Sequence, residues 1–301
     1  MLSRKNKLRI LKVFSLFSVV RGYNIVIIVL AQYLTSIFIL APDRSLREII
    51  LDPNLLVLVL ASAGVIAAGY IINSFYDSEK DLINRPQKTM LDRLVSQRTK
   101  LTGYFVLNFL STVLASYVSF KAVLFFSGYI FAIWFYSHKL KKMPIIGNAI
   151  ASLLAITPFF AVFVYYKNFD AVIFVHATFL FLMIAMRELI KDLENLKGDL
   201  AQNYRTIPIV YGELTSKRLL TMFAIASMIP MYLLLAEFEI GHMYLYFYGV
   251  VALLFLFVFL LWKSNKRTHY LILHNILKFI IVSGVFGILL IDVQVVLSRL
   301  L

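Results

Sequence analysis

The chain of 301 residues is 61% hydrophobic and only 15% charged, and its mean hydropathy of +0.83 excludes an ordinary soluble protein of this size, since soluble domains carry about 25% charged residues. The net charge of +14 does not indicate a nucleic-acid partner, because basic loops on the cytoplasmic side of a membrane protein account for it. The absence of cysteine excludes disulfides, thiolate metal sites and a cysteine nucleophile.

About nine segments of the chain are apolar enough to cross a bilayer, for which a helix needs about 20 apolar residues. In chain order they are residues 22–41, 55–76, 101–120, 121–137, 145–166, 170–190, 217–236, 243–262 and 276–297. Together they use most of the chain and leave no separate soluble domain. The sequence therefore predicts an all-α, polytopic membrane bundle, with residues 1–301 as a single transmembrane domain.

The basic connections predict how the bundle is oriented. Cytoplasmic loops carry an excess of Lys and Arg, and with nine spans every basic connection falls on the side of the basic N-terminus. We therefore expect an integral protein of the cytoplasmic membrane, with its N-terminus in the cytoplasm and its C-terminus outside. The N-terminal region has basic residues before an apolar run, as a signal peptide does, but Arg21 and Asn24 interrupt that run. We expect the first helix to be retained.

Acidic residues gather at the ends of two predicted spans. Of the 16 Asp and Glu residues, seven lie within residues 77–81 and 188–199, and both stretches fall on the predicted cytoplasmic side. One such stretch alone is more often a solvated helix boundary. Two stretches on the same side of the membrane indicate a functional site.

Each acidic stretch places three oxygen-bearing side chains along one helical face. They are Asn73, Asp77 and Asp81 at spacings i, i+4 and i+8, and Asp192, Asn195 and Asp199 at spacings i, i+3 and i+7. Like charges one turn apart repel, so each face needs a cation. Carboxylate and amide oxygens favour a hard ion such as Mg²⁺, which bridges to substrate phosphates. The two faces are therefore predicted to hold a magnesium–diphosphate between them.

Basic and amide side chains near the acidic stretches complete a candidate anion site. They are Arg85 and Lys88 after the first stretch, Lys139, Lys141 and Asn148 after the fourth span, Arg187 and Lys191 ahead of the second stretch, and Arg205. A diphosphate is bound by metal together with such donors. Arg187 and Lys191 are the most specific of them, because they share a helix end with the carboxylates. Any one of the others alone also fits an ordinary cytoplasmic-loop residue.

Several motifs resemble those of the UbiA superfamily of intramembrane prenyltransferases. NSFYDSEKD (73–81) is similar to the first aspartate motif, Asn-Asp-x-x-Asp-x-x-x-Asp, with Ser74 in place of one Asp. DLENLKGD (192–199) is similar to the second motif, Asp-x-x-Asp-x-x-x-Asp, with Asn195 in place of the middle Asp. VRGYN, which contains Arg21 and Asn24, resembles the first-helix Arg-Pro-x-Asn, INRP follows the first motif as expected, and YSHKLKKMPIIGN resembles the Tyr-x-x-x-Leu-Lys and Gly-Asn segment.

The resemblance implies a nine-helix enzyme in which both aspartate motifs hold Mg²⁺ and a prenyl diphosphate. The diphosphate departs, an allylic carbocation forms, and a membrane-associated acceptor captures it. In this scheme Asp77, Asp192 and Lys191 are the predicted catalytic residues, and Arg21 and Asn24 join the substrate-binding set.

The sequence specifies the acceptor less closely than it specifies the prenyl diphosphate. The stretches RELIKDLENLKGD and RTIPIVYG are closest in texture to the branch that attaches geranylgeranyl to geranylgeranylglyceryl phosphate. The branches that prenylate hydroxybenzoate, dihydroxynaphthoate or homogentisate share the same core.

Two other classes compete with a prenyltransferase. A transporter normally carries buried charges near the membrane midplane on broken helices, whereas the acids here lie at helix ends. A protein that only binds an isoprenoid or a quinone shares every motif named above, and only turnover separates it from an enzyme. The sequence indicates membrane lipid as a partner and does not predict the oligomeric state.

Overall fold

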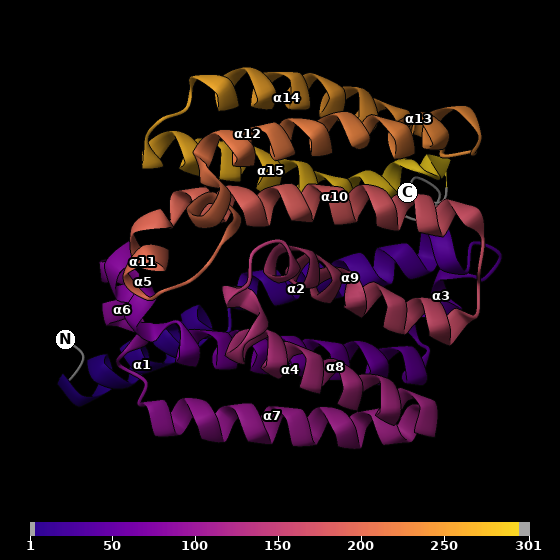
Figure 1. Ribbon diagram of the computed structural model, residues 1–301. Coiled ribbons are helices and arrows are strands. Elements are labelled where there is room, and N and C mark those ends of the chain that lie inside the picture. Colours follow the sequence, from indigo (N-terminus) through magenta and orange to yellow (C-terminus); the bar gives the residue numbers. More distant parts are fainter. Residues whose placement is uncertain (1–3, 295–301) are drawn as a thin grey trace.

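The computed structural model describes residues 4–294, which form helices joined by short connections, without a strand in that range (Figure 1). Its helices are α1 (Arg4–Val19), α2 (Gly22–Thr35), the π-helical η1 (Ser36–Leu40), α3 (Leu46–Ile50), α4 (Pro53–Tyr76), α5 (Ser78–Asn84), α6 (Pro86–Asp92), α7 (Gln97–Val118), α8 (Phe120–His138), η2 (Leu140–Lys142), α9 (Ile146–Tyr166), α10 (Ala171–Glu194), α11 (Leu196–Ala201), α12 (Ile207–Ala226), α13 (Met228–Ala236), η3 (Gly241–Met243), α14 (Tyr244–Lys263), α15 (Arg267–Gly287) and η4 (Ile288–Leu290).

Nine helical segments within residues 4–294 are long and apolar enough to span a membrane, which confirms the predicted all-α membrane bundle. Most agree with the predicted spans to within a few residues. The seventh begins earlier than predicted, at Ile207, and the ninth covers Arg267–Leu290 instead of 276–297. The ninth was displaced because polar residues such as His269 and His274 interrupt its apolar run near the start. Residues 295–297 lie outside the described part of the chain.

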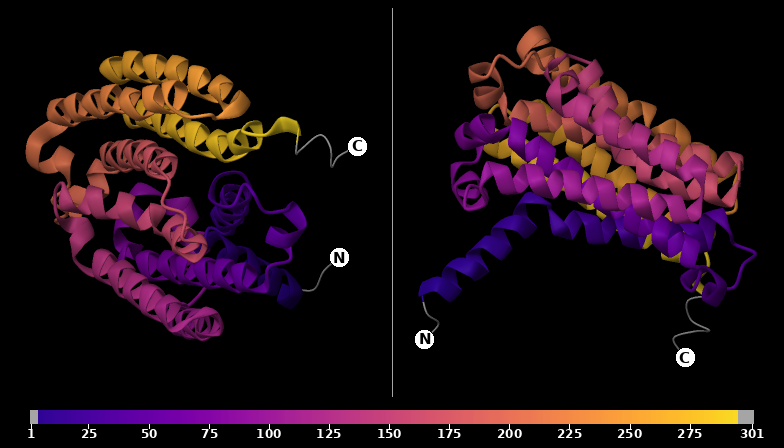
Figure 2. Two further views of the ribbon diagram at one scale, coloured as in Figure 1. Left: turned by 90° about the vertical axis from the view of Figure 1, so that its right-hand side faces the viewer. Right: turned by 90° about the horizontal axis from the view of Figure 1, so that it is seen from below.

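The helix α1 precedes the first span and was not predicted as a separate element. Figure 2 shows it leaving the bundle at an angle, at the same end as α5 and α6. The Ser15 hydroxyl donates to the Leu91 carbonyl, 2.8 Å away, and so joins α1 to the end of α6. Apolar side chains such as Val13 and Phe14 are more than 60% exposed, which is typical of a helix that lies in the membrane interface.

A proline inside α9 shows how the bundle satisfies its backbone away from water. Pro158 has no N–H, so the carbonyl of Leu154 one turn earlier loses its helical partner. The Tyr129 hydroxyl of α8 donates to that carbonyl at 2.9 Å. The buried Gln32 of α2 donates to the Pro158 carbonyl at 2.8 Å. Tyr129 therefore replaces the missing bond, as required in a membrane interior, and Gln32 adds a further bond between α2 and α9.

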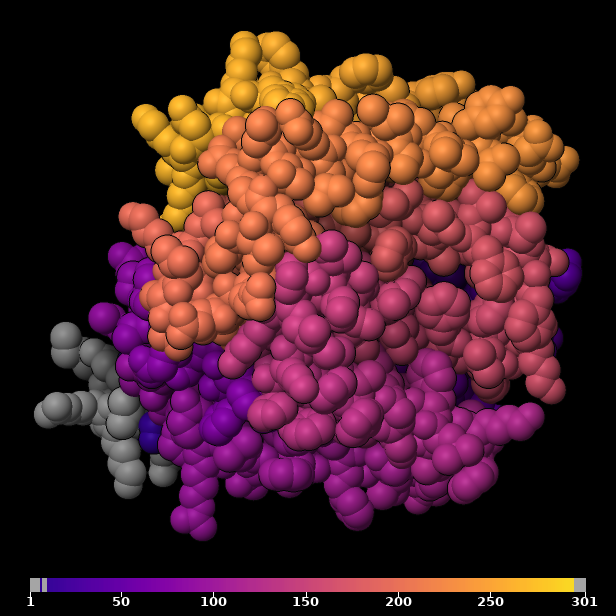
Figure 3. Space-filling model, in the orientation of Figure 1, coloured from indigo at the N-terminus to yellow at the C-terminus, as the bar shows by residue number. Residues whose placement is uncertain are grey.

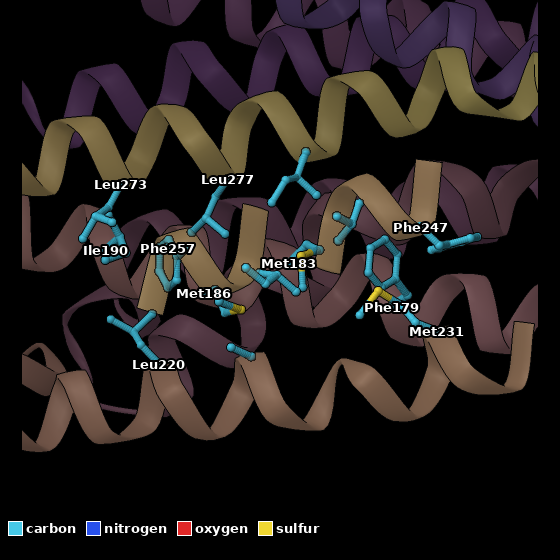
Figure 4. Packing of buried hydrophobic residues seen from close by; sticks show 14 of the residues in the cluster. Phe179, Met183, Met186, Ile190, Leu220, Met231, Phe247, Phe257, Leu273 and Leu277 are labelled. Atoms are coloured by element: carbon cyan, nitrogen blue, oxygen red, sulfur yellow. The ribbon is translucent and has the colours of Figure 1, made fainter. Parts of the chain in front are cut away.

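Two hydrophobic cores divide the bundle. The first lies among the helices from α2 to α9, with Phe126 and Leu55 among its fully buried members. The second lies among α10 to α15, where side chains of α10 meet those of α12, α14 and α15 (Figure 4). In the space-filling view of Figure 3, the helices α12 and α14 of the second half lie above the magenta helices of the first half. The candidate site lies between these halves.

Candidate active site

A cavity of about 360 Å³ is lined by both halves of the bundle, with side chains from α2, α4, α5, α8, α9, α10 and α15. Its charged part lies at the end where α5 and α11 meet, to the left in Figure 1. The acidic side chains there come from the ends of α4 and α10 and from the short helix α5. The two acidic stretches are therefore brought to one cavity.

The first acidic stretch keeps its helical repeat through a helix break. The helix α4 ends at Tyr76, Asp77 caps it, and α5 begins at Ser78. The backbone N–H of Asp77 nevertheless bonds to the Asn73 carbonyl at 2.9 Å, and that of Asp81 to the Asp77 carbonyl at 2.8 Å. Because the repeat persists, Asn73, Asp77 and Asp81 all line the cavity, as the spacing predicts.

The second acidic stretch crosses a similar break between α10 and α11. The backbone N–H of Asp199 bonds to the Asn195 carbonyl at 3.1 Å, which continues the helical repeat. Asp192 and Asn195 line the cavity. Asp199 does not line it, and its fully buried carboxylate lies 2.9 Å from the Lys80 ammonium group. Lys80 therefore connects the first stretch to the second.

Asp77 is the most heavily engaged carboxylate of the site. Its Oδ1 accepts hydrogen bonds from Lys141 at 2.7 Å and from the Tyr204 hydroxyl at 2.8 Å. Burial alone would raise the pKa of Asp77, but the charges of Lys80 and Lys141 and these hydrogen bonds lower it to about 2. The carboxylate is thus held in its ionised form.

The aromatic ring of Tyr204 gathers the lysines around Asp77. The ammonium group of Lys80 lies 4.3 Å from the ring centroid, and that of Lys142 lies 5.4 Å from it. Burial alone would lower the pKa of Lys80, but the carboxylates of Asp77 and Asp199 raise it above the usual value. Lys80 and Asp77 therefore both stay charged.

A second ionic cluster forms around Glu194, the last residue of α10. Its buried carboxylate lies 2.9 Å from Arg85, 3.1 Å from His274 Nδ1 and 3.7 Å from Arg267. Arg267 also donates to the Asn84 carbonyl at 3.0 Å. This cluster joins α5, α10 and α15, and it holds Arg85 at the cavity wall.

Most of the predicted site residues line the cavity. They are Arg21, Asn24, Asn73, Asp77, Asp81, Arg85, Lys141, Asn148, Arg187, Lys191, Asp192 and Asn195. Three predicted anion-binding residues do not. Lys88 is exposed and lies 3.3 Å from Asp92, Lys139 is exposed, and Arg205 is exposed with its backbone N–H bonded to Lys142. Asp199, buried behind the wall, is the predicted metal ligand that does not line the cavity.

Sequence reasoning missed several polar residues of the site. Lys80, Glu188 and Lys278 line the cavity, and Tyr204 binds Asp77 from behind. Lys80 was detectable, because it is three residues after Asp77 and so lies near it on a helix. Glu188 pairs with Lys191, one turn away. Lys278 was also detectable, because it is a charged residue within an apolar span. No sequence pattern pointed to Tyr204.

Unpartnered oxygens test whether the site fits a divalent cation. The carboxylates of Asp81 and Asp192 accept no hydrogen bond within residues 4–294, and the buried Oδ1 of Asn195 also lacks a partner there. No three acidic, His or Cys side chains of that range are close enough to hold an ion by themselves. Mg²⁺ is usually held by one or two carboxylates together with substrate phosphates and water. These residues fit that mode of binding and not an all-protein cage.

A second, apolar cavity of about 130 Å³ continues from the first. The two share Ala31, Phe159, Leu180, Ile281 and Val285, and the second is otherwise lined mostly by aliphatic and aromatic side chains. Its few polar members include Tyr246, whose hydroxyl already bonds to the Ile280 carbonyl at 3.0 Å. The site thus has a charged end and an apolar extension.

The comparisons with known proteins agree on one family. The model described as "UbiA prenyltransferase family" matches residues 29–279. A digeranylgeranylglyceryl phosphate synthase from Thermococcus sibiricus is 34% identical over 162 residues, which are 54% of this chain and 57% of that relative. The match therefore spans less than two thirds of that relative's length.

Solved structures share the fold. One comes from work on the biosynthesis of digeranylgeranylglyceryl phosphate synthase in membranes, with a TM-score of 0.68 and 21% identity over 92% of this chain and 97% of that one. Another is a UbiA homolog from Archaeoglobus fulgidus bound to GPP and Mg²⁺, with a TM-score of 0.65 and 16% identity over 91% of this chain and 99% of that one.

Proposed function

The chain belongs to the UbiA prenyltransferase family, and from that premise we propose that it transfers a geranylgeranyl group from its diphosphate to geranylgeranylglyceryl phosphate. The enzyme is an integral, multi-pass membrane protein. The curated relative from Thermococcus sibiricus, named for the synthesis of digeranylgeranylglyceryl phosphate, supports this acceptor.

The observation that carries the proposal is the division of the cavity into a charged end and an apolar extension. A prenyl diphosphate has the same division, with an anionic head and a hydrocarbon tail. Arg187 and Lys191 line the charged end together with the carboxylates. The apolar extension continues beyond residues such as Leu180 and Phe159. A single substrate molecule can therefore be bound along both parts.

Bound Mg²⁺ would neutralise charge on the departing diphosphate, and the residues that fit it are the carboxylates of Asp81 and Asp192 and the amide oxygen of Asn195. Arg187 and Lys191 supply donors for the phosphate oxygens as the bond from carbon to oxygen breaks. The apolar walls keep water away from the allylic cation that remains. The acceptor hydroxyl then forms the new ether bond and releases its proton.

We also propose that the charged end faces the cytoplasm. The basic connection between α14 and α15 and the basic N-terminal region support this orientation, because both lie at that end of the bundle (Figure 1). The lipid acceptor then reaches the site from the bilayer. We propose the cytoplasmic membrane as the location, with residues 1–301 acting as one transmembrane domain.

Purified protein in detergent, with Mg²⁺ and labelled geranylgeranyl diphosphate, tests the proposal against a panel of acceptors. The panel contains geranylgeranylglyceryl phosphate, dihydroxynaphthoate, 4-hydroxybenzoate and homogentisate. We expect product with the first and none with the aromatic acids. Turnover only with an aromatic acid would instead assign the protein to quinone biosynthesis. The Asp77→Asn and Asp192→Asn variants serve as inactive controls. A protein that binds geranylgeranyl diphosphate but forms product with none of the acceptors would be a non-catalytic carrier.

A further inference from the structure

Three basic side chains in the cavity wall form no ion pair within residues 4–294. They are Arg21, Arg187 and Lys278. The other basic residues of the wall are each paired with a carboxylate, as Lys141 is with Asp77 and Arg85 is with Glu194. An unpaired cation within a membrane bundle is costly and generally marks a functional site. The charges of Asp81 and Glu188 reach Arg21, and that of Glu188 reaches Arg187, without direct contact. A bound anion would therefore be the first direct ionic partner of these three residues.

Lys278 lies deep in α15. It is 11 residues from the first residue of that helix, which corresponds to about 16 Å along the helix axis. His274, one turn nearer the start, bonds to Glu194, so Lys278 lies about one turn deeper than that cluster. Its ammonium group is 4.8 Å from the ring centroid of Tyr23 on α2. The Lys278 charge is thus stabilised by the Tyr23 ring and remains available to a ligand.

Arg21 is placed similarly, directly before the neighbouring helix α2. It occupies the turn between α1 and α2 with a left-handed φ of 49°, which directs the chain from one helix into the other. Its guanidinium carbon lies 5.0 Å from the ring centroid of Tyr70, whose hydroxyl accepts a hydrogen bond from Asn24 at 3.2 Å. Arg21, in the turn that begins α2, and Lys278, on α15, are therefore both held by aromatic rings, and these two helices pack together.

The helices α2 and α15 carry no residue of the two acidic stretches. Arg187 shares α10 with Asp192 and Lys191, and so belongs with the donor diphosphate in the proposed function. Lipid-facing side chains such as Val26 and Phe279 are more than 60% exposed on α2 and α15. One side of this helix pair thus faces the bilayer, and the other side places the two unpaired cations, Arg21 and Lys278, at the cavity.

We propose that Arg21 and Lys278 form a separate subsite for the phosphate monoester of the lipid acceptor. A phosphate monoester carries a charge between about −1.5 and −2 at neutral pH, so it needs cations beyond those that hold the donor diphosphate. Entry beside α2 and α15 lets the acceptor keep its hydrocarbon chain in lipid while its head reaches the cavity. The inference rests on the proposed function, because a neutral or carboxylate acceptor would not need two cations here.

Direct binding separates this subsite from the reaction. With EDTA present and no donor, calorimetry should show that Lys278→Gln binds geranylgeranylglyceryl phosphate at least about tenfold more weakly than the parent protein, because a charge-assisted bond is lost. Lys278→Arg should retain most of the affinity. Lys263→Gln is the matched control, since the Lys263 ammonium group also lies over an aromatic ring, 4.0 Å from the Phe259 centroid, but outside the cavity. Its affinity should be unchanged.

Steady-state kinetics then assigns the subsite to one substrate. The KM for the acceptor should rise about 10- to 100-fold in Lys278→Gln, while the KM for geranylgeranyl diphosphate stays within about threefold. An unchanged acceptor affinity, or an equal loss for the donor, would overturn the inference. If Lys278→Gln does not insert, Lys278→Met and Arg21→Gln provide the same test. A parent protein that uses only aromatic acceptors would instead overturn the proposed function, before any variant is compared.

Discussion

At the residue scale, the acidic site is organised by side chains that neither bind substrate nor line the cavity. Tyr204 is the clearest example. It is buried in the segment after α11, and its hydroxyl donates to Asp77 while its ring contacts the ammonium group of Lys80. It thereby fixes one carboxylate and one cation in relation to each other.

Removing the Tyr204 hydroxyl should weaken the site without removing any charge. In Tyr204→Phe the ring still contacts Lys80, but Asp77 loses a hydrogen bond to its ionised form. Such bonds contribute about 1.5–3 kcal/mol, so we expect kcat/KM to fall by about tenfold or more. Steady-state kinetics with varied prenyl diphosphate and Mg²⁺ is the measurement. The half-exposed Tyr211 provides the control, and equal activity of Tyr204→Phe and Tyr211→Phe would show that the Tyr204 bond is dispensable.

The residue scale also shows what the sequence could predict. The spacing of Asn73, Asp77 and Asp81 correctly placed them on one face, because the helical hydrogen bonds continue through the break at Asp77. In the segment NYRTIP the predicted residue was Arg205, yet the side chain that reaches the site is its neighbour Tyr204. A tertiary contact of that kind leaves no periodic signal in the sequence.

At the element scale, the short helices α5 and α11 depend on a close contact at Gly198. Its backbone N–H donates to the Asn84 side chain at 3.1 Å, and Asn84 is itself buried. A Cβ at position 198 would lie 2.3 Å from Asn84 Nδ2 and 2.7 Å from its Cγ. Only glycine permits the two helices to approach this closely, and this approach brings the two acidic stretches together.

We therefore expect Gly198→Ala to separate α5 from α11. The overlap should destabilise the protein by about 1–3 kcal/mol and lower turnover more than it lowers prenyl diphosphate binding. Thermal unfolding in detergent and steady-state kinetics measure the two effects. In Gly249→Ala, the control on α14, the new Cβ meets no heavy atom within 4 Å, and helix propensity favours alanine by about 1 kcal/mol. A Gly198→Ala protein as stable and active as Gly249→Ala would contradict the close-contact explanation.

Element boundaries were predicted well where apolar runs are uninterrupted and poorly where polar residues serve the site. The span α4 is apolar from Leu55 to Ile72, and its predicted limits agree with Pro53–Tyr76. The first turns of α15 contain His269, His274 and Asn275, and His274 bonds to Glu194, so hydropathy alone moved the predicted start of this span to residue 276. A polar residue that serves the site, His274, therefore contributes to the late predicted start of this span.

At the scale of the whole molecule, the two halves enclose a continuous path from the charged cavity to the apolar one. The helix α10 contributes to both, with Asp192 at the charged end and Ala177 in the apolar cavity. If the apolar cavity receives the prenyl tail, its size limits the length of that tail. The sequence indicated an isoprenoid substrate only through family motifs, because the shape of a cavity depends on how helices pack.

Filling the apolar cavity should change the preferred chain length. Ala177→Phe introduces a ring into a space of about 130 Å³. We expect kcat/KM for geranylgeranyl diphosphate to fall by about tenfold or more, while that for geranyl diphosphate stays within about threefold, since the longer tail loses apolar contacts worth about 0.8 kcal/mol per methylene. Ala171→Phe, at the exposed start of α10, is the control. Equal losses for both donors would place the tail elsewhere.

The orientation of the whole bundle can be tested directly because the chain has no cysteine. Glu239 lies in the exposed, acidic connection after α13, and Lys266 in the exposed, basic connection between α14 and α15. Since basic connections remain in the cytoplasm, an impermeant maleimide added to intact cells should label Glu239→Cys and not Lys266→Cys. Both should react after permeabilisation, and the cysteine-free parent should react in neither condition. The reverse pattern would place the charged end of the cavity outside the cell, where the basic connections of a membrane protein are not normally found.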